Sequence, residues 1–210
     1  MPDGSTPGVR RGRKFEQVLE GAREVFMTDG FEGASVDDIA RAAGVSKATL
    51  YSYFPDKQLL FLEVAKSECA RQAALAQKSI ENDAPVREVL TRVAGRLMDF
   101  MTSDFGRRMF RICAGESERF PTIGREFYES GPCLVRARMI EYLGAARDRG
   151  ELRIDDMDLA ADQFPALCKA GVFDRLVFGV TDVPTPQDRA RTIEGAVDTF
   201  LARYGTADQP

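Results

Sequence analysis

In the stretch Ser35–Lys57, SVDDIARAAGVSKATLYSYFPDK, two short helical patterns meet at a glycine. A serine precedes each pattern and can cap the helix that follows. The first helix is expected over residues 36–42, where Asp38 would complete a capping box with the serine before it. Gly44 then supplies a turn with positive φ, and a second helix follows over residues 47–53. This arrangement predicts a helix-turn-helix.

The second helix has two chemically different sides. Leu50 and Phe54, four residues apart, are predicted to face inward. The other side chains offer a cation, several hydroxyl groups and a small alanine, which suit a helix that enters the major groove of DNA. The residues assigned to DNA contact on this helix and at its ends are Ser46, Lys47, Ala48, Thr49, Tyr51, Ser52, Tyr53 and Lys57.

Individual roles follow from position and chemistry. Lys47 and Thr49 are the candidates for base edges. Ser46, Tyr51 and Lys57 are the candidates for phosphates. A basic arm before the first helix could lie along the phosphates or in the minor groove, although it could also be a solvated terminus. This arm consists of Arg10, Arg11, Arg13 and Lys14.

The same region resembles the N-terminal signature of TetR-type transcriptional regulators. The matching segments are Phe31-Glu32-Gly33, Ile39–Ser46, Thr49-Leu50-Tyr51 and Tyr53–Lys57. The resemblance runs from about residue 15 to about residue 65, and it departs at Tyr53, where the family often has histidine. It implies that the helix-turn-helix binds operator DNA.

A second resemblance lies in the C-terminal half. The segments Gly115–Pro121 and Phe127–Pro132 resemble the ligand domain of the AefR-like branch of the same family. This resemblance implies a helical ligand-binding half.

Composition excludes several classes of protein. The chain has 210 residues, a formal net charge of −4 and no histidine. Catalysis by serine–histidine or cysteine–histidine pairs is therefore excluded. The four cysteines lack Cys-x-x-Cys spacing, so neither disulfide staples nor a zinc site is predicted. We expect no catalytic residue, no metal and no cofactor. Neither a membrane span nor a signal peptide is evident, and a cytoplasmic location is expected.

Apolar residues recur at helical spacing along the rest of the chain, which predicts an all-α fold. Helices are expected over about residues 14–28, 57–79, 86–101, around 109–113, from 132 to about 148, over 159–178 and around 193–204. An N-terminal arm and helix-turn-helix domain is assigned to residues 1–57. A helical effector-binding and dimerisation domain is assigned to residues 58–210.

The last two expected helices carry more apolar side chain than one internal face requires. They predict a homodimer in which two helices from each subunit form a four-helix bundle. The alternative is that these apolar faces complete the core of the monomer.

Adaptable and aromatic side chains are concentrated in the C-terminal half. Methionine and phenylalanine can repack around varied shapes, and ligand pockets are mostly apolar. The sequence therefore predicts a hydrophobic, neutral or weakly polar effector, although any helical core contains such residues. The candidate ligand-binding residues are Phe100, Met101, Met109, Phe110, Cys113, Phe127, Tyr128, Met139, Phe164, Leu167 and Cys168.

The leading hypothesis is a ligand-responsive transcriptional repressor. It would bind a palindromic operator in double-stranded DNA as a dimer, and a hydrophobic small molecule would release it. In the family that the sequence resembles, the ligand shifts the helix equivalent to residues 57–79. One alternative is a redox-sensing regulator that uses Cys113 or Cys133. A minor alternative is a helical enzyme that uses carboxylates such as Glu116, Glu118 or Glu126.

Overall fold

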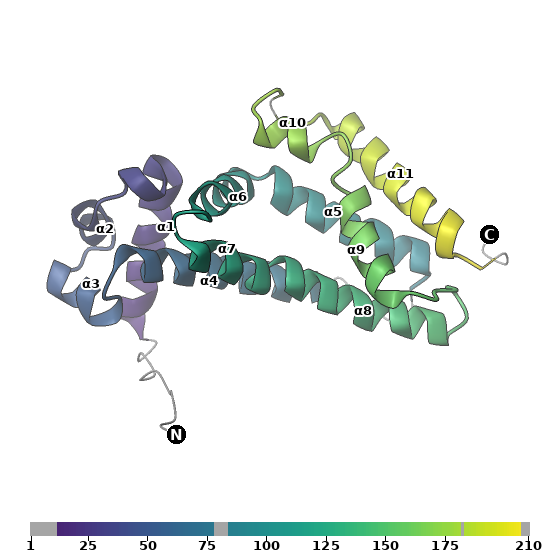
Figure 1. Ribbon diagram of the computed structural model, residues 1–210, viewed down its shortest axis with the longest axis horizontal. Helices are drawn as coiled ribbons and strands as arrows, with labels where there is room; N and C mark the ends of the chain where they lie inside the picture. The colour runs from purple at the N-terminus through teal and green to yellow at the C-terminus, as the bar shows by residue number, and fades with distance from the viewer. Residues whose placement is uncertain (1–11, 78–83, 182, 207–210) are drawn as a thin grey trace, which may run out of the picture.

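The computed structural model describes residues 12–77, 84–181 and 183–206, and in these ranges the regular structure is helical (Figure 1). The one isolated β-bridge in the described ranges pairs Leu152 with Gly205. The all-α fold class is therefore confirmed. Arg10 and Arg11, two of the four predicted arm residues, lie outside the described residues.

Three helices form the N-terminal group. They are α1 (Arg13–Gly33), α2 (Val36–Ala42) and α3 (Lys47–Tyr53). The expected stop at the end of the first helix is a kink within α1, where Gly30 has φ 74°. This left-handed conformation suits glycine, and it folds Phe31 back into the core, where 5% of its surface is exposed.

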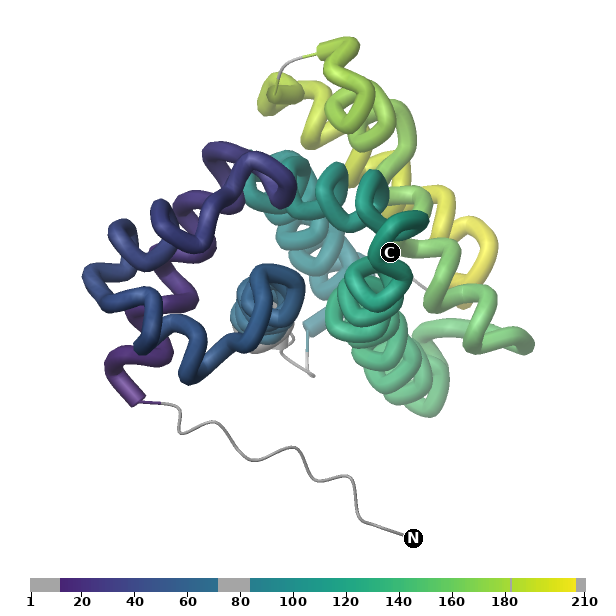
Figure 2. Tube along the Cα trace, turned by 60° about the vertical axis from the view of Figure 1, so that its left-hand side comes forward, coloured from purple at the N-terminus to yellow at the C-terminus, as the bar shows by residue number. Residues whose placement is uncertain are grey.

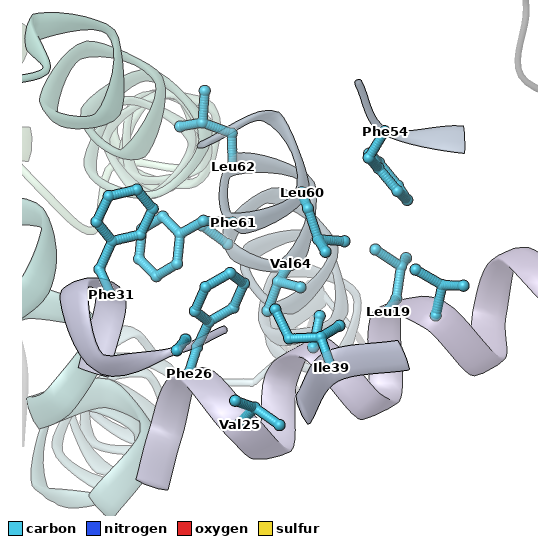
Figure 3. Close-up of a cluster of buried hydrophobic side chains, with 14 of the residues drawn as sticks. Leu19, Val25, Phe26, Phe31, Ile39, Phe54, Leu60, Phe61, Leu62 and Val64 are labelled. Carbon is cyan, nitrogen blue, oxygen red and sulfur yellow. The ribbon is translucent and has the colours of Figure 1, made fainter. Parts of the chain in front are cut away.

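One hydrophobic cluster joins the N-terminal group to the next helices. It contains residues from α4 (Lys57–Gln77), α6 (Asp104–Glu116) and α7 (Pro121–Ser130) as well as from α1 to α3. In Figure 3, the rings of Phe26, Phe31 and Phe61 lie side by side, and their centroids are 5.1–6.1 Å apart. The N-terminal helices are therefore packed on the C-terminal half rather than held on a tether.

Helix α4 is the largest link between the two halves. It packs against α1 on one side and against α7 on another. In Figure 2 it runs through the middle of the molecule, between the N-terminal helices and α7. The domain boundary predicted at residue 57 coincides with the first residue of α4. The first hydrophobic cluster contains residues from both sides of this boundary.

A second hydrophobic cluster lies away from the N-terminal group. It is formed mainly by α5 (Val86–Thr102), α8 (Pro132–Asp148), α9 (Met157–Leu167) and α11 (Pro186–Tyr204), with Phe173 from the short α10 (Phe173–Val177). Helix α11 packs along α5 and α9. In Figure 1 it covers the side of the molecule that is remote from α3.

One sequence expectation about the helices was wrong, and one helix was not predicted. A single helix over residues 159–178 is divided into α9 and α10, because Gly171 has φ 71° and turns the chain between them. The helix expected around residues 109–113 is present as α6, which ends at Glu116, whereas α7, which begins at Pro121, was not predicted. Between α9 and α10, a short loop interrupts an apolar pattern that looks continuous in the sequence.

The apolar stripe of α11 is used within the monomer. Val197 and Phe200 are each 1% exposed, and the Phe200 ring packs edge-on against Phe164 of α9 at 5.1 Å. The alternative weighed from the sequence, that this stripe completes the monomer core, accounts for these residues. Any dimer contact on α11 must therefore use its outer face.

Candidate nucleic-acid interface

The turn between α2 and α3 is fixed by backbone hydrogen bonds. Val45 N–H donates to Ala40 C=O at 3.0 Å, and Gly44 N–H donates to Arg41 C=O at 3.1 Å. These two bonds form a Schellman motif, which requires a left-handed residue at its centre. Gly44 has φ 63°, as the sequence predicts, so the angle between α2 and α3 is set by the backbone.

The predicted serine caps are present on both helices. Ser46 Oγ accepts from Thr49 N–H at 3.1 Å and lies 2.9 Å from Thr49 Oγ1. Ser35 Oγ accepts from Asp38 N–H, also at 3.1 Å. The Ser35 hydroxyl in turn donates to the Asp38 carboxylate, which lowers the pKa of Asp38 together with the hydrogen bond from Arg41. Each cap satisfies an N–H group that the helix leaves unpaired.

Helix α3 has a buried inner side and an exposed outer side, as predicted. Leu50 and Phe54 are buried at 1% and 6% exposure, and the Phe54 ring lies 5.4 Å from that of Phe15 on α1. The outer side chains are Ser46, Lys47, Ala48, Tyr51 and Ser52, which are all exposed. Tyr51 is 49% exposed, so its hydroxyl is available to an approaching duplex.

Two of the assigned residues lie between these sides. Thr49 is half-buried, with its hydroxyl beside that of Ser46. Tyr53 is half-buried, and its ring packs edge-on against Phe15 at 5.8 Å. Tyr53 therefore anchors α3 to α1, and any contact with DNA would come from the edge of its ring.

Both lysines of the predicted interface have partners within the protein. Lys47 Nζ forms an ion pair with the Asp37 carboxylate of α2. Lys57 Nζ donates to Ala34 C=O at 3.2 Å and lies 4.7 Å from the centre of the Phe31 ring. A phosphate contact by Lys57 thus stays a prediction, and it would require the ammonium group to leave these partners.

The part of the basic arm that the structure describes forms the start of α1. Arg13 and Lys14 are the first two residues of that helix, and both side chains are exposed. They can approach phosphates without any rearrangement of the core.

The candidate effector residues do not form one group. Met109 and Cys113 are buried in the first cluster, with Phe100 and Phe127 packed against it. A second set belongs to the other cluster, and it comprises Met101, Phe110, Met139, Phe164, Leu167 and Cys168. Tyr128 is 58% exposed on α7. Helix α6 carries residues of both sets, because Met109 and Phe110 are adjacent in sequence and face different clusters.

Two grooves of about 470 Å³ each open on the described surface. One lies between α1 and α4 and is lined largely by charged residues such as Glu20, Arg23 and Glu68. The other lies between α9 and α11. Of the candidate effector residues, Leu167 alone lines either of these grooves.

Contacts between α1 and the α6–α7 region were not predicted from the sequence. The Phe31 and Phe120 rings pack edge-on at 5.6 Å, and the Arg23 guanidinium lies 4.8 Å from the centre of the Phe105 ring. Arg108 also donates to Met27 C=O, and Arg119 pairs with Glu32. These partners are 81 or more residues apart, and no local pattern indicates such pairs.

The three buried cysteines are poorly suited to redox sensing. Cys113 and Cys168 are at most 2% exposed, and burial raises the pKa of each thiol to about 12. Burial also raises the pKa of Cys69. A reactive cysteine needs a lowered pKa and access, so these thiols remain protonated and shielded. Cys133 is half-buried.

Two other features are absent from the described residues. No helix there is both long and apolar enough to cross a membrane. No cluster of three or more metal-ligating side chains occurs in the same part of the chain.

The sequence and the fold both match known protein families and solved structures. Residues 18–64 match the family described as bacterial regulatory proteins of the tetR family, and residues 88–206 match the C-terminal domain of AefR-like transcriptional repressors. A solved protein described as a TetR-family regulator from Mesorhizobium loti superposes with a TM-score of 0.87, at 26% identity over 94% of this chain and 100% of that one.

Two further relatives are informative. The flavonoid-responsive regulator FrrA is 35% identical over 93% of this chain and 99% of its own, with a TM-score of 0.75. The transcriptional repressor AcnR of Corynebacterium glutamicum is 38% identical over 64 residues, which are 30% of this chain. This chain spans about a third of the length of the first curated relatives that it matches. The chain belongs to the TetR family of bacterial transcriptional regulators, DNA-binding proteins without enzymatic activity, and has an AefR-like C-terminal domain.

Proposed function

We propose that this chain is a ligand-responsive repressor that binds a palindromic operator as a homodimer and is released by a hydrophobic small molecule. It would act in the cytoplasm, where operator DNA lies. The observation that carries the proposal is the exposed polar side of α3, held at a fixed angle by the α2–α3 turn.

The polar side of α3 matches the needs of a major-groove reader. Lys47 and Thr49 lie in the first turn of the helix, where recognition helices contact base edges. Tyr51 and Ser46 lie where hydroxyl groups can hold phosphates, and Ala48 allows close approach. Because Lys47 pairs with Asp37, operator binding would exchange an exposed intramolecular ion pair for contacts with DNA. An exposed pair is worth at most about 1 kcal/mol, so this exchange costs little.

The shared core supports a ligand response. Residues of α4, α6 and α7 pack in the same cluster as α1 to α3, so a displacement in the C-terminal half would be transmitted to α3. We propose that the effector lies near α6, because its Met109 and Phe110 face the two clusters. A coupling of about 1–3 kcal/mol would lower operator affinity by roughly 5- to 150-fold.

The chemical class of the effector follows from the side chains around α6. Methionine, phenylalanine and protonated cysteine side chains lie on this helix and beside it, and they favour an apolar ligand. FrrA, a relative similar over nearly its whole length, is named as flavonoid-responsive, which is consistent with a largely apolar aromatic compound here.

The dimer would form through the outer faces of α9 and α11. Two copies related by a two-fold axis present two α3 helices, and such a pair reads the two halves of a palindromic site.

The direct test is selection of duplexes from fragmented genomic DNA with the purified chain. The proposal predicts enrichment of a palindrome, followed by release of the duplex when a hydrophobic aromatic compound is added. Enrichment without symmetry would contradict the dimeric operator. Release by sugars or phosphates alone would contradict the apolar effector.

A further inference from the structure

The end of α10 displays two apolar side chains on a rigid turn. Val180 N–H donates to Arg175 C=O at 2.8 Å, and Gly179 N–H donates to Leu176 C=O at 3.2 Å. Gly179 has φ 68°, so these bonds form a Schellman motif. Phe178 and Val180 are nevertheless 80% and 68% exposed.

A side chain of another helix reinforces this turn. Arg111 on α6 donates through Nε to Val177 C=O at 2.7 Å and through Nη2 to Leu176 C=O at 2.6 Å. The guanidinium group thereby bonds the Val177 carbonyl at the end of α10 and gives the Leu176 carbonyl a second donor. The backbone that carries Phe178 and Val180 is therefore held by hydrogen bonds within the turn and by hydrogen bonds from Arg111 of α6.

The turn lacks the apolar contact that usually accompanies its geometry. In a Schellman motif the residue after the left-handed glycine commonly packs against the third or fourth residue from the end of the helix. Here that residue is Val180, and the positions it would meet are Arg175 and Asp174, which are both charged and exposed. The apolar pair is thus built rigidly and left uncovered within the chain.

A groove of the same chain lies between α9 and the C-terminal half of α11. The groove between α9 and α11 has a volume of about 470 Å³, and its lining includes Ala166, Leu167, Ala170, Thr199 and Phe200. Helix α11 is 19 residues long, so its ends lie about 28 Å apart. In Figure 1, α10 lies near the start of α11, and Thr199 and Phe200 belong to the last two turns.

The outer face of α11 permits close approach by a second helix. Gly195, Thr199 and Ala202 lie on one side at helical spacing, and all three are exposed. A Cβ atom built on Gly195 would meet nothing within 4 Å. Small residues at this spacing let a second helix approach closely.

We propose that the apolar turn formed by Phe178 and Val180 inserts into the α9–α11 groove of a second copy of this chain. The inference rests on the dimer proposed above and specifies its anchor. If α11 packs antiparallel to α11 of the partner, the start of each helix lies beside the end of the other. The turn of each copy then fills the groove of the other copy. The contact is therefore isologous, and the assembly ends at a dimer. The rigid backbone lowers the entropy cost of placing an aromatic anchor in a pocket.

Sedimentation velocity over a range of concentrations tests this anchor. Phe178→Ser should raise the dimer dissociation constant at least tenfold. Leu59→Ser, which removes an exposed apolar side chain on α4, should leave it unchanged. Circular dichroism of both variants confirms that the helices are retained. A dimeric wild type with an unaffected Phe178→Ser variant would overturn the inference but leave the dimer proposal intact. A monomeric wild type at micromolar concentration would overturn the dimer and its anchor together.

Cross-linking identifies the position that the turn occupies. A chain carrying Phe178→Cys is mixed with one carrying Ala170→Cys, each in a background with Cys133→Ala, and treated with a short bis-maleimide. The proposal predicts a mixed cross-link between positions 178 and 170 of different chains. Efficient cross-linking of two 178 positions, without the mixed product, would show that the turns meet each other and would overturn the assignment to the groove.

Discussion

A Cβ atom built on Gly21 would lie 2.5 Å from the backbone nitrogen of Ala43, so α1 meets the end of α2 through its backbone. Ala43 immediately precedes the glycine of the α2–α3 turn. The position of α3 relative to α1 therefore depends on the absence of a side chain at residue 21.

Gly21→Ala should destabilise the protein by about 1–3 kcal/mol, because the added methyl group must displace backbone atoms. This cost exceeds the roughly 0.5–1 kcal/mol that alanine gains over glycine in a helix. Gly95→Ala in α5 is the matched control, since its Cβ would meet nothing within 4 Å. Urea unfolding should show opposite signs for the two variants. Equal stabilisation would refute the close contact.

The packing of Phe31 on Phe120 is expected to link α1 to the α6–α7 loop. The two rings lie edge-on at 5.6 Å, and such pairs contribute about 0.5–1.5 kcal/mol beyond area burial. A double-mutant cycle with Phe31→Leu and Phe120→Leu should therefore give a coupling energy in this range. Additive effects on the free energy of unfolding would show that the two elements are energetically independent.

Stability should fall at alkaline pH because two thiols are buried in protonated form. Burial raises the pKa of Cys113 and of Cys168 from 9.0 to about 12. Below pH 9 both the folded and the unfolded chain keep these protons, so the two thiols add no pH dependence. Above pH 9 the unfolded chain loses them first, and each thiol lowers the free energy of unfolding by up to about 1.4 kcal/mol per pH unit.

Urea unfolding between pH 8 and pH 10.5 measures this loss. Cys168→Ala should lower stability at pH 8 through lost packing but make the decline above pH 9 shallower. Cys133→Ala, which removes a half-buried thiol, is the comparison. A decline in Cys168→Ala as steep as in the wild type would mean that Cys168 ionises equally in the folded and unfolded chain.

Local chemistry in the sequence was sufficient for the helix-turn-helix. Serine caps, the left-handed Gly44 and the inward pair Leu50 and Phe54 act within a few residues, and all are present in the structure. The C-terminal half was harder to predict. Gly171 divides a continuous apolar pattern, and glycine is also tolerated inside helices, so its left-handed conformation could not be inferred.

Hydrogen bonding over long sequence distances also escaped prediction. Lys57 was assigned to phosphates from its place after α3, whereas its ammonium group binds a carbonyl of the α1–α2 connection. The partner Ala34 lies 23 residues away, and backbone acceptors leave no mark in the sequence. Side-chain type alone therefore could not show which cations have partners within the protein.

If the polar side of α3 binds duplex DNA, the affinity must depend on salt concentration, because lysine contacts with phosphates release counterions. Fluorescence anisotropy with an enriched duplex should give a log affinity that falls linearly with log salt concentration. Lys47→Ala should reduce that slope by about one and relax the sequence preference, because lysine contributes a charge and a base contact. Tyr51→Phe should weaken all duplexes similarly without changing the slope. Unchanged affinity, slope and sequence preference in both variants would contradict the assignment of α3 as the reading helix.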